Sequence, residues 1–314
     1  MVSPVNTSFA PRGRAFSAAA ALGLVLALTS CTGDDDGTGI VVTTNILGDV
    51  TREIVDDEAE ITVLMKPGAD PHSFGISARE AAILENADLV VHNGLGLEEG
   101  IARNVAAAEE AGVPTLEVAA EVDPLPYTSD ADEGSPDPHF WTDPVRMLTA
   151  VDLITEHVVA EVDGVDAEAV RAGAESYAAE IEELDGWMSD EFGSLPAESR
   201  RLVTDHHVFG YLADRYDFEV IGAVVPGGTT LASPSSADLK DLSDAVAEAG
   251  VSAVFSDSSQ PDRLVTVMAE EAGVDIEVIP LHSESLSAEG EGAATYLEMM
   301  RANTEAITDG LRGG

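Results

Sequence analysis

The stretch DAEAVRAGAESYAAEIEELDGWMSDEF, Asp166 to Phe192, stands between two halves of the chain that share one pattern. Its apolar residues recur at intervals of three, four and seven, which places them on one side of an α-helix. They are Val170, Tyr177, Ile181, Leu184 and Trp187. Helical character extends back to Asp143, with one interruption at VDGVD, residues 162–166. The pattern predicts a long, stiff helical connection.

On both sides of this connection, short β-branched segments alternate with Ala/Glu-rich segments. The expected strands are GIVVTTN (39–45), AEITVLM (59–65), ADLVVHN (87–93), VPTLEV (113–118), RLVTD (201–205), FEVIGAVV (218–225), VSAVFSD (251–257) and DIEVIPL (275–281). The expected helices are AREAAILENA (78–87), EEGIARNVAAAEEAG (98–112), FGYLADRY (209–216), SADLKDLSDAVAEAG (236–250) and DRLVTVMAEEAG (262–273). Continuous apolar strands between helices need cover on both faces. We therefore predict an α/β fold with two parallel-sheet βα lobes, residues 40–142 and 199–314, joined by a helical connection at 143–198.

The N-terminus has the form of a targeting segment. Arg12 and Arg14 precede an apolar run, residues 15–30, which is too short to span a membrane and reads as the end of a signal peptide covering 1–30. Cys31 follows and is the only cysteine, so an intrachain disulfide is impossible. The segment resembles a bacterial lipobox, which implies that Cys31 is lipidated. Residues 31–39 then form a tether.

Composition excludes one class of partner. The net charge is −44, from 59 acidic and 15 basic residues, with the acidic residues spread over the chain. Such a surface repels phosphate backbones, so nucleic-acid binding is excluded. The acidity suits solubility or salt adaptation and identifies no ligand.

Four histidines lie in junctions between an expected strand and a helix, and His207 directly follows His206 in one of them. His72 stands in PGADPHSF, His139 in SPDPHFWTDP and His206 after RLVTD. Intervals of 67 residues separate these three, so only the tertiary fold could bring them together. In both copies of Asp-Pro-His, proline fixes the backbone and aspartate can bond a backbone N–H or the imidazole. This arrangement favours histidines held as metal ligands.

Four segments carry a family resemblance. PGADPHSF, DPHFWTDP, TDHHVFGYLADRYDFEVIG and SESLSAEGEGAATYLEMMRANTEAI resemble signatures of the metal-binding proteins of bacterial ABC importers, the ZnuA/TroA/PsaA type. The last segment is most similar to the Azt-type zinc-binding lipoproteins. The resemblance runs from about Ile40 to the C-terminus, and implies two lobes joined by a long helix with one ion in the cleft between them. The family's ligands fall on His72, His139, His206 and Glu284, the last where aspartate is usual.

Several residues remain alternatives for the site. Asp257 is the rival carboxylate ligand, and His282 is a reserve ligand. His207, Asp70 and Asp137 are candidates for supporting hydrogen bonds to the ligands. His92 and His157 are expected to pack or face solvent.

The donor set and the resemblance together predict the function. Three imidazoles and a carboxylate suit one Zn²⁺ per chain, with Mn²⁺ as the alternative cargo. The resemblance implies an extracytoplasmic lipoprotein, anchored to the outer face of the cell membrane, that delivers zinc to an ABC permease with its ATPase. A metallochaperone donor and a monomeric state are further expectations. A zinc metallohydrolase and a surface adhesin are the rivals, but a hydrolase signature such as HExxH is absent from the sequence.

Overall fold

The computed structural model describes residues 39–128, 132–261, 263–271 and 276–312. The predicted signal peptide and Cys31, with the tether up to residue 38, lie outside the described residues. No helix in the described ranges is long and apolar enough to cross a membrane.

The first lobe is built on a parallel sheet with strand order β2-β1-β3-β4. Its strands are β1 (Ile40–Val42), β2 (Ile61–Val63), β3 (Leu89–His92) and β4 (Thr115–Glu117). Its helices are α1 (Asn45–Val55), α2 (Ala78–Leu84), α3 (Ala102–Ala111) and α4 (Val118–Glu121). Val41 and Val90 pack with the apolar side chains of α2 and α3, whereas Ile40 and Val91 pack with those of α1 on the other face. Both faces of the sheet are therefore covered, as expected for parallel strands.

The second lobe repeats this topology with strand order β6-β5-β7-β8. Its strands are β5 (Arg201–Thr204), β6 (Glu219–Ala223), β7 (Ala253–Asp257) and β8 (Glu277–Leu281). Its helices are α7 (Gly210–Tyr216), α8 (Ser236–Ala249), α9 (Arg263–Glu271) and α10 (Tyr296–Arg312). Val203 and Val254 pack with α8 and α9, and Leu202 and Phe255 face the opposite layer. The two-lobed α/β fold predicted from the sequence is confirmed.

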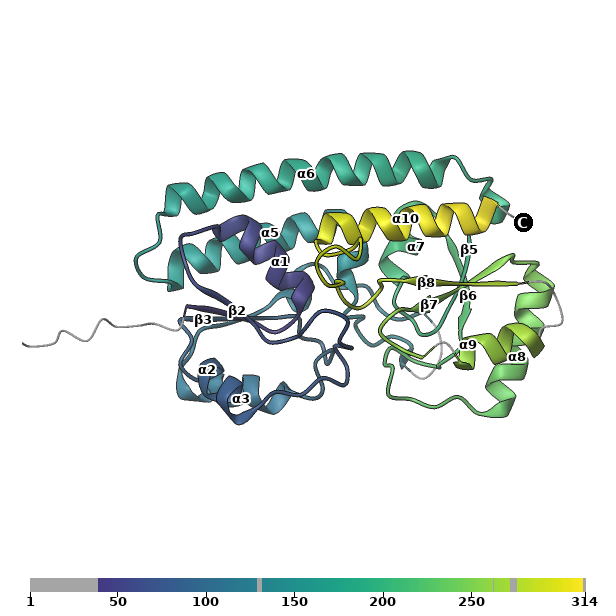
Figure 1. The fold of residues 1–314 in the computed structure, drawn as a ribbon, viewed down its shortest axis with the longest axis horizontal. Helices are drawn as coiled ribbons and strands as arrows, with labels where there is room; N and C mark the ends of the chain where they lie inside the picture. Colours follow the sequence, from purple (N-terminus) through teal and green to yellow (C-terminus); the bar gives the residue numbers. More distant parts are fainter. Residues whose placement is uncertain (1–38, 129–131, 262, 272–275, 313–314) are drawn as a thin grey trace, which may run out of the picture. The chain divides into compact units, whose positions relative to one another are not determined.

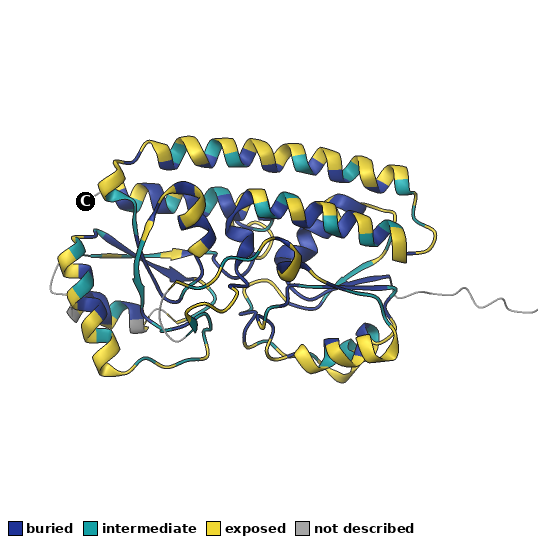
Figure 2. Ribbon diagram, turned by 180° about the vertical axis from the view of Figure 1, so that it is seen from behind, coloured by how far each residue is buried: buried dark blue, intermediate teal, exposed yellow. Residues whose placement is uncertain are grey.

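Two antiparallel helices form the connection, α5 (Pro144–Glu161) and α6 (Ala167–Gly193), followed by a 3₁₀ turn at Ala197–Ser199 (Figure 1). The 27 residues of α6 extend roughly 40 Å at 1.5 Å per residue. Helix α6 packs on α1 of the first lobe and on α10 of the second. One hydrophobic cluster consequently runs from Ile40 through α6 to Leu311, and α6 shows its exposed side to solvent along its length (Figure 2). The core ties both lobes to the same helix.

Helix ends follow local sequence signals. Asp143 caps α5 by accepting a hydrogen bond from the Val145 N–H, with Pro144 in the first turn. Asp166 caps α6 in the same way. The apolar side of α6 differs slightly from prediction, because Met188 is buried where Trp187 was expected. Trp187 is only partly buried and lies under the guanidinium of Arg301.

The first expected strand is shorter than predicted. GIVVTTN continues as a strand only to Val42, because the Thr44 side chain accepts a hydrogen bond from the Leu47 N–H and starts helix α1. Helices α1 and α10 were not predicted from the sequence. Both pack on α6 and complete the layer that joins the lobes.

Candidate metal centre

Four side chains from separate parts of the chain converge in one place. His72 follows β2, and His139 immediately precedes the 3₁₀ turn Phe140–Thr142 that leads into α5. His206 follows β5, and Glu284 follows β8. Loops at the carboxyl ends of parallel strands are where ligands bind in open α/β sheets. Each lobe therefore contributes two of the four groups.

The four groups are close enough to share one ion. One ligand atom from each lies within 4.8 Å of all the others, and all four residues are buried. The Nε2 atoms of His72 and His139 are 3.4 Å apart. Glu284 Oε1 lies 3.0 Å from His206 Nε2 and 3.5 Å from His139 Nε2. The Oε2 atom of Glu284 is 3.8 Å from His72 Nε2 and has no hydrogen-bond partner.

Asp137 fixes the orientation of His139. Its Oδ1 accepts hydrogen bonds from the backbone N–H of His139 at 2.9 Å and from the ring Nδ1 at 2.6 Å. A carboxylate on Nδ1 keeps the proton there and leaves Nε2 free as a ligand atom. The Tyr211 hydroxyl donates a hydrogen bond to the backbone carbonyl of Asp137. The ring of Trp141 lies in edge contact with His139, and its N–H donates to the backbone carbonyl of Ser283. The DPH turn thus aims Nε2 at the other ligand atoms.

The first DPH turn works through the backbone. Asp70 Oδ1 accepts a hydrogen bond from the backbone N–H of His72 at 2.9 Å. The imidazole of His72 is buried, and burial together with the neighbouring His139 and His206 lowers its pKa to about 2. A histidine that stays neutral keeps its lone pair available for a metal at every physiological pH.

His206 has a different electrostatic setting. Burial lowers its pKa, but the carboxylates of Asp205 and Glu284 outweigh burial and raise this pKa well above its ordinary value. The Nδ1 atom of His206 lies 3.3 Å from Asp205 Oδ1 but forms no hydrogen bond. Glu284 Oε2 is also buried without a hydrogen bond, and a cation bound among the four side chains would give this oxygen a partner.

The rival carboxylate is placed differently. Asp257 is buried, but its Oδ1 accepts hydrogen bonds from Ser259 and its Oδ2 accepts one from Ser283. Burial, Asp205 and Glu284 raise its pKa to about 6. Asp257 is not part of the converging group and instead anchors the segment that carries Glu284.

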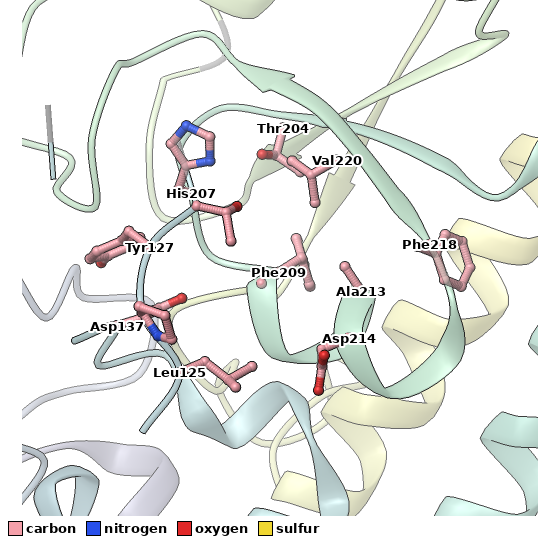
Figure 3. Close-up of a pocket in the computed structure, with 13 residues that line it drawn as sticks. Leu125, Tyr127, Asp137, Thr204, His207, Phe209, Ala213, Asp214, Phe218 and Val220 are labelled. Carbon is pink, nitrogen blue, oxygen red and sulfur yellow. The ribbon is translucent and has the colours of Figure 1, made fainter. Parts of the chain in front are cut away.

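The remaining histidines also lie apart from the group. His282 is half-buried and its Nδ1 contacts the Ser258 hydroxyl at 3.2 Å. His207 lines a separate cavity of about 430 Å³ with Tyr127 and Phe209 (Figure 3). His157 lies on α5, with its Nδ1 2.8 Å from the carbonyl of Leu153. His92 ends β3.

Some parts of the site were not predicted from the sequence. Asn45 donates to the Ser285 hydroxyl at 2.7 Å and accepts from the backbone N–H of Leu286, so it links the first lobe to the Glu284 segment. The Tyr127 hydroxyl lies 3.3 Å from His139 Nδ1 and donates to the carbonyl of Gly228. No local motif marks either residue, because their partners lie far away in the sequence.

Comparison with known proteins finds relatives that are named as metal-binding proteins. The manganese-binding lipoprotein MntA of Bacillus subtilis is 30% identical, with 94% of this chain and 98% of the relative covered. The iron-binding protein YfeA of Yersinia pestis is 28% identical, over 87% of this chain and 86% of the relative. The solved structure of the periplasmic zinc-binding protein TroA from Treponema pallidum matches with a TM-score of 0.79 at 27% identity, covering 88% and 99% of the two chains.

Fold and site together define a two-lobed, metal-binding substrate-binding protein of the ABC-importer type rather than an enzyme. Residues 40–310 match the model of the zinc-uptake complex component A family, ZnuA, and the chain belongs to this family.

Proposed function

We propose that this chain captures Zn²⁺ outside the cytoplasm and passes it to the permease of an ABC importer, which is driven by its ATPase. The observation that carries the proposal is the convergence of His72, His139, His206 and Glu284 within 4.8 Å of one another. The metal is cargo here, so the four residues need to bind it tightly and also to release it.

The donor set favours zinc. Zn²⁺ takes nitrogen and oxygen ligands in a tetrahedral arrangement at about 2.0–2.2 Å, and three imidazoles with one carboxylate supply four such ligands. Mn²⁺ prefers more oxygen ligands. Binding in the nanomolar range corresponds to about −12 kcal/mol, which is within reach of a protein zinc site.

Manganese is the second candidate cargo. A specific observation favours it, because Glu284 Oε2 is buried without a hydrogen-bond partner and is available as a further oxygen ligand. MntA, which is named as a manganese-binding lipoprotein, is among the relatives. A bidentate Glu284 would raise the number of oxygen ligands to two and suit the larger coordination shell of Mn²⁺.

The remaining parts of the proposal concern location and partners. Lipidation of Cys31 would hold the protein on the outer face of the cell membrane, where the permease lies. The acidic segment YTSDADEGSPD, 127–137, contains no histidines for collecting zinc. A metallochaperone donor would make such histidines unnecessary, and a monomer is sufficient for one site per chain.

Native mass spectrometry of protein purified from its own host tests the proposal. One zinc atom per chain is the expected result. One manganese atom per chain would establish the second candidate, and a bound organic solute without metal would contradict both.

A further inference from the structure

Asp70 connects the two lobes directly beside a proposed ligand. Its Oδ1 accepts from the backbone N–H of His72 in the first lobe. Its Oδ2 accepts from the Thr230 hydroxyl at 2.8 Å and from the Gln260 side-chain amide at 3.0 Å, and both of these donors belong to loops of the second lobe. A third donor to Oδ2, the Ser73 hydroxyl at 2.8 Å, belongs to the same turn as His72.

Besides the Trp141–Ser283 and Tyr211–Asp137 hydrogen bonds beside His139, two sets of contacts join the lobes, and we call them the first and second seams. At the first seam, buried Asn45 pairs with Ser285 and Leu286, and the backbone N–H of Gly68 donates to the Leu286 carbonyl. At the second seam, the loop at 227–230 and Gln260 meet the first lobe mainly through side chains that are partly exposed, including Thr230 and Gln260 themselves. Bonds accessible to water break at lower cost than buried ones. We therefore expect the second seam to open at lower cost than the first.

Other bonds of the second seam depend on the same loop. Asp132 accepts from the backbone N–H of Gly228 at 2.9 Å, and the Tyr127 hydroxyl donates to the Gly228 carbonyl at 3.4 Å. Gly228 itself lies so close to Tyr127 that an added Cβ would stand 1.8 Å from the phenol oxygen. Among the acceptors at this seam, Asp70 is the one whose carboxylate also holds the backbone of a proposed ligand.

We propose that Asp70 is a positioning residue that couples closure of the second seam to the placement of His72, and so sets the rate at which the metal leaves. When Thr230 and Gln260 are bonded to Asp70, the second lobe holds the His72 turn in place. When those bonds break, the carboxylate keeps only the hydrogen bonds within its own turn, and the His72 turn can shift away from the other three ligands. This inference rests on the proposed metal-binding function.

Two single substitutions distinguish coupling between the lobes from simple support of the His72 turn by Asp70. Thr230→Val and Ser73→Ala each remove one hydroxyl at 2.8 Å from the same oxygen, Asp70 Oδ2, but only Thr230 crosses between the lobes. Loss of a hydrogen bond to a charged group should make zinc dissociate about tenfold faster into excess chelator in Thr230→Val. Gln260→Ala should act in the same direction, with association rates close to those of the wild type. Ser73→Ala should release zinc at the wild-type rate.

Hydrogen–deuterium exchange of the metal-free protein gives a second readout that needs no metal. Thr230→Val should speed exchange in the 225–231 segment and in the His72 turn, while Ser73→Ala should leave both unchanged. Equal exchange and release rates in Thr230→Val and wild type would overturn the proposal, as would equal effects of the two substitutions. A wild-type protein that binds no metal would refute the proposed function, and the exchange experiment would still decide whether Asp70 couples the lobes.

Discussion

Asp137 accepts two hydrogen bonds from His139 on one oxygen, one from the backbone and one from the ring. Asp137→Asn removes the charge that keeps the proton on Nδ1, so metal affinity should fall about 10- to 100-fold. Competition titration against a chelator of known affinity measures this change. An affinity equal to that of the wild type would show that Asp137 does not orient the ligand.

His206 makes metal binding depend on pH. Its pKa is raised, so in the metal-free protein at pH 7 the ring carries a proton that a metal at Nε2 must displace. His72 contributes no proton, because its pKa is lowered to about 2. Affinity should therefore weaken as pH falls, and binding at pH 7 should release about one proton per chain.

The proton count is measured from the binding enthalpy in buffers of different ionisation enthalpy. The released fraction should decrease at higher pH, as the metal-free protein loses the proton of His206. Zero release at pH 7 would contradict the assignment of His206 as a protonated ligand.

At the scale of elements, Gly173 allows helix α6 to lie directly on the end of α1. A Cβ at Gly173 would stand 2.5 Å from the carbonyl oxygen of Ile54, whereas one at Gly186 on the same helix would meet nothing within 4 Å. Alanine favours a helix over glycine by about 1 kcal/mol. Gly186→Ala should accordingly stabilise the protein by up to about 1 kcal/mol.

Gly173→Ala should instead destabilise the protein. The clash is with backbone, so the helices must separate, at a cost of about 1–3 kcal/mol that exceeds the gain in helix propensity. Denaturant unfolding of both variants gives the free energies of unfolding. Equal stabilisation by the two substitutions would show that the α1–α6 contact tolerates a side chain.

Elements with strong local signals could be predicted from the sequence. The β-branched runs predicted the eight strands found in the described part of the chain, and the Asp143–Pro144 pair predicted the start of α5. Helix α1 was missed because GIVVTTN reads as one strand, although Thr44 is a capping residue. The bonds of Asp70 to Thr230 and Gln260 could not be predicted, because they span 160 and 190 residues and depend on how the lobes close.

The candidate ligands could be predicted only partly from local sequence. The repeated DPH turn singled out His72 and His139, the junction after RLVTD offered His206 beside His207, and family resemblance selected His206 and supplied Glu284. Local sequence did not separate Glu284 from Asp257. In the structure the two carboxylates differ in their hydrogen bonds. Serines donate to both oxygens of Asp257, whereas Glu284 Oε2 accepts no hydrogen bond.

At the scale of the whole molecule, the metal should stabilise the fold, because its proposed ligands come from both lobes. At free zinc 1,000 times the dissociation constant, the gain should be about 4 kcal/mol. Thermal unfolding with and without zinc measures this gain. Glu284→Gln should lose most of the zinc-induced increase in Tm, and a full increase in that variant would exclude Glu284 as a ligand.

We propose that His72, His139, His206 and Glu284 together bind one zinc ion between the lobes. Anomalous diffraction at the zinc edge from crystals of the zinc-loaded protein tests this most directly. We predict one peak, about 2.0–2.2 Å from an oxygen of Glu284 and from the Nε2 atoms of all three histidines. A peak elsewhere, or a peak with Glu284 more than about 3 Å away, would contradict the claim.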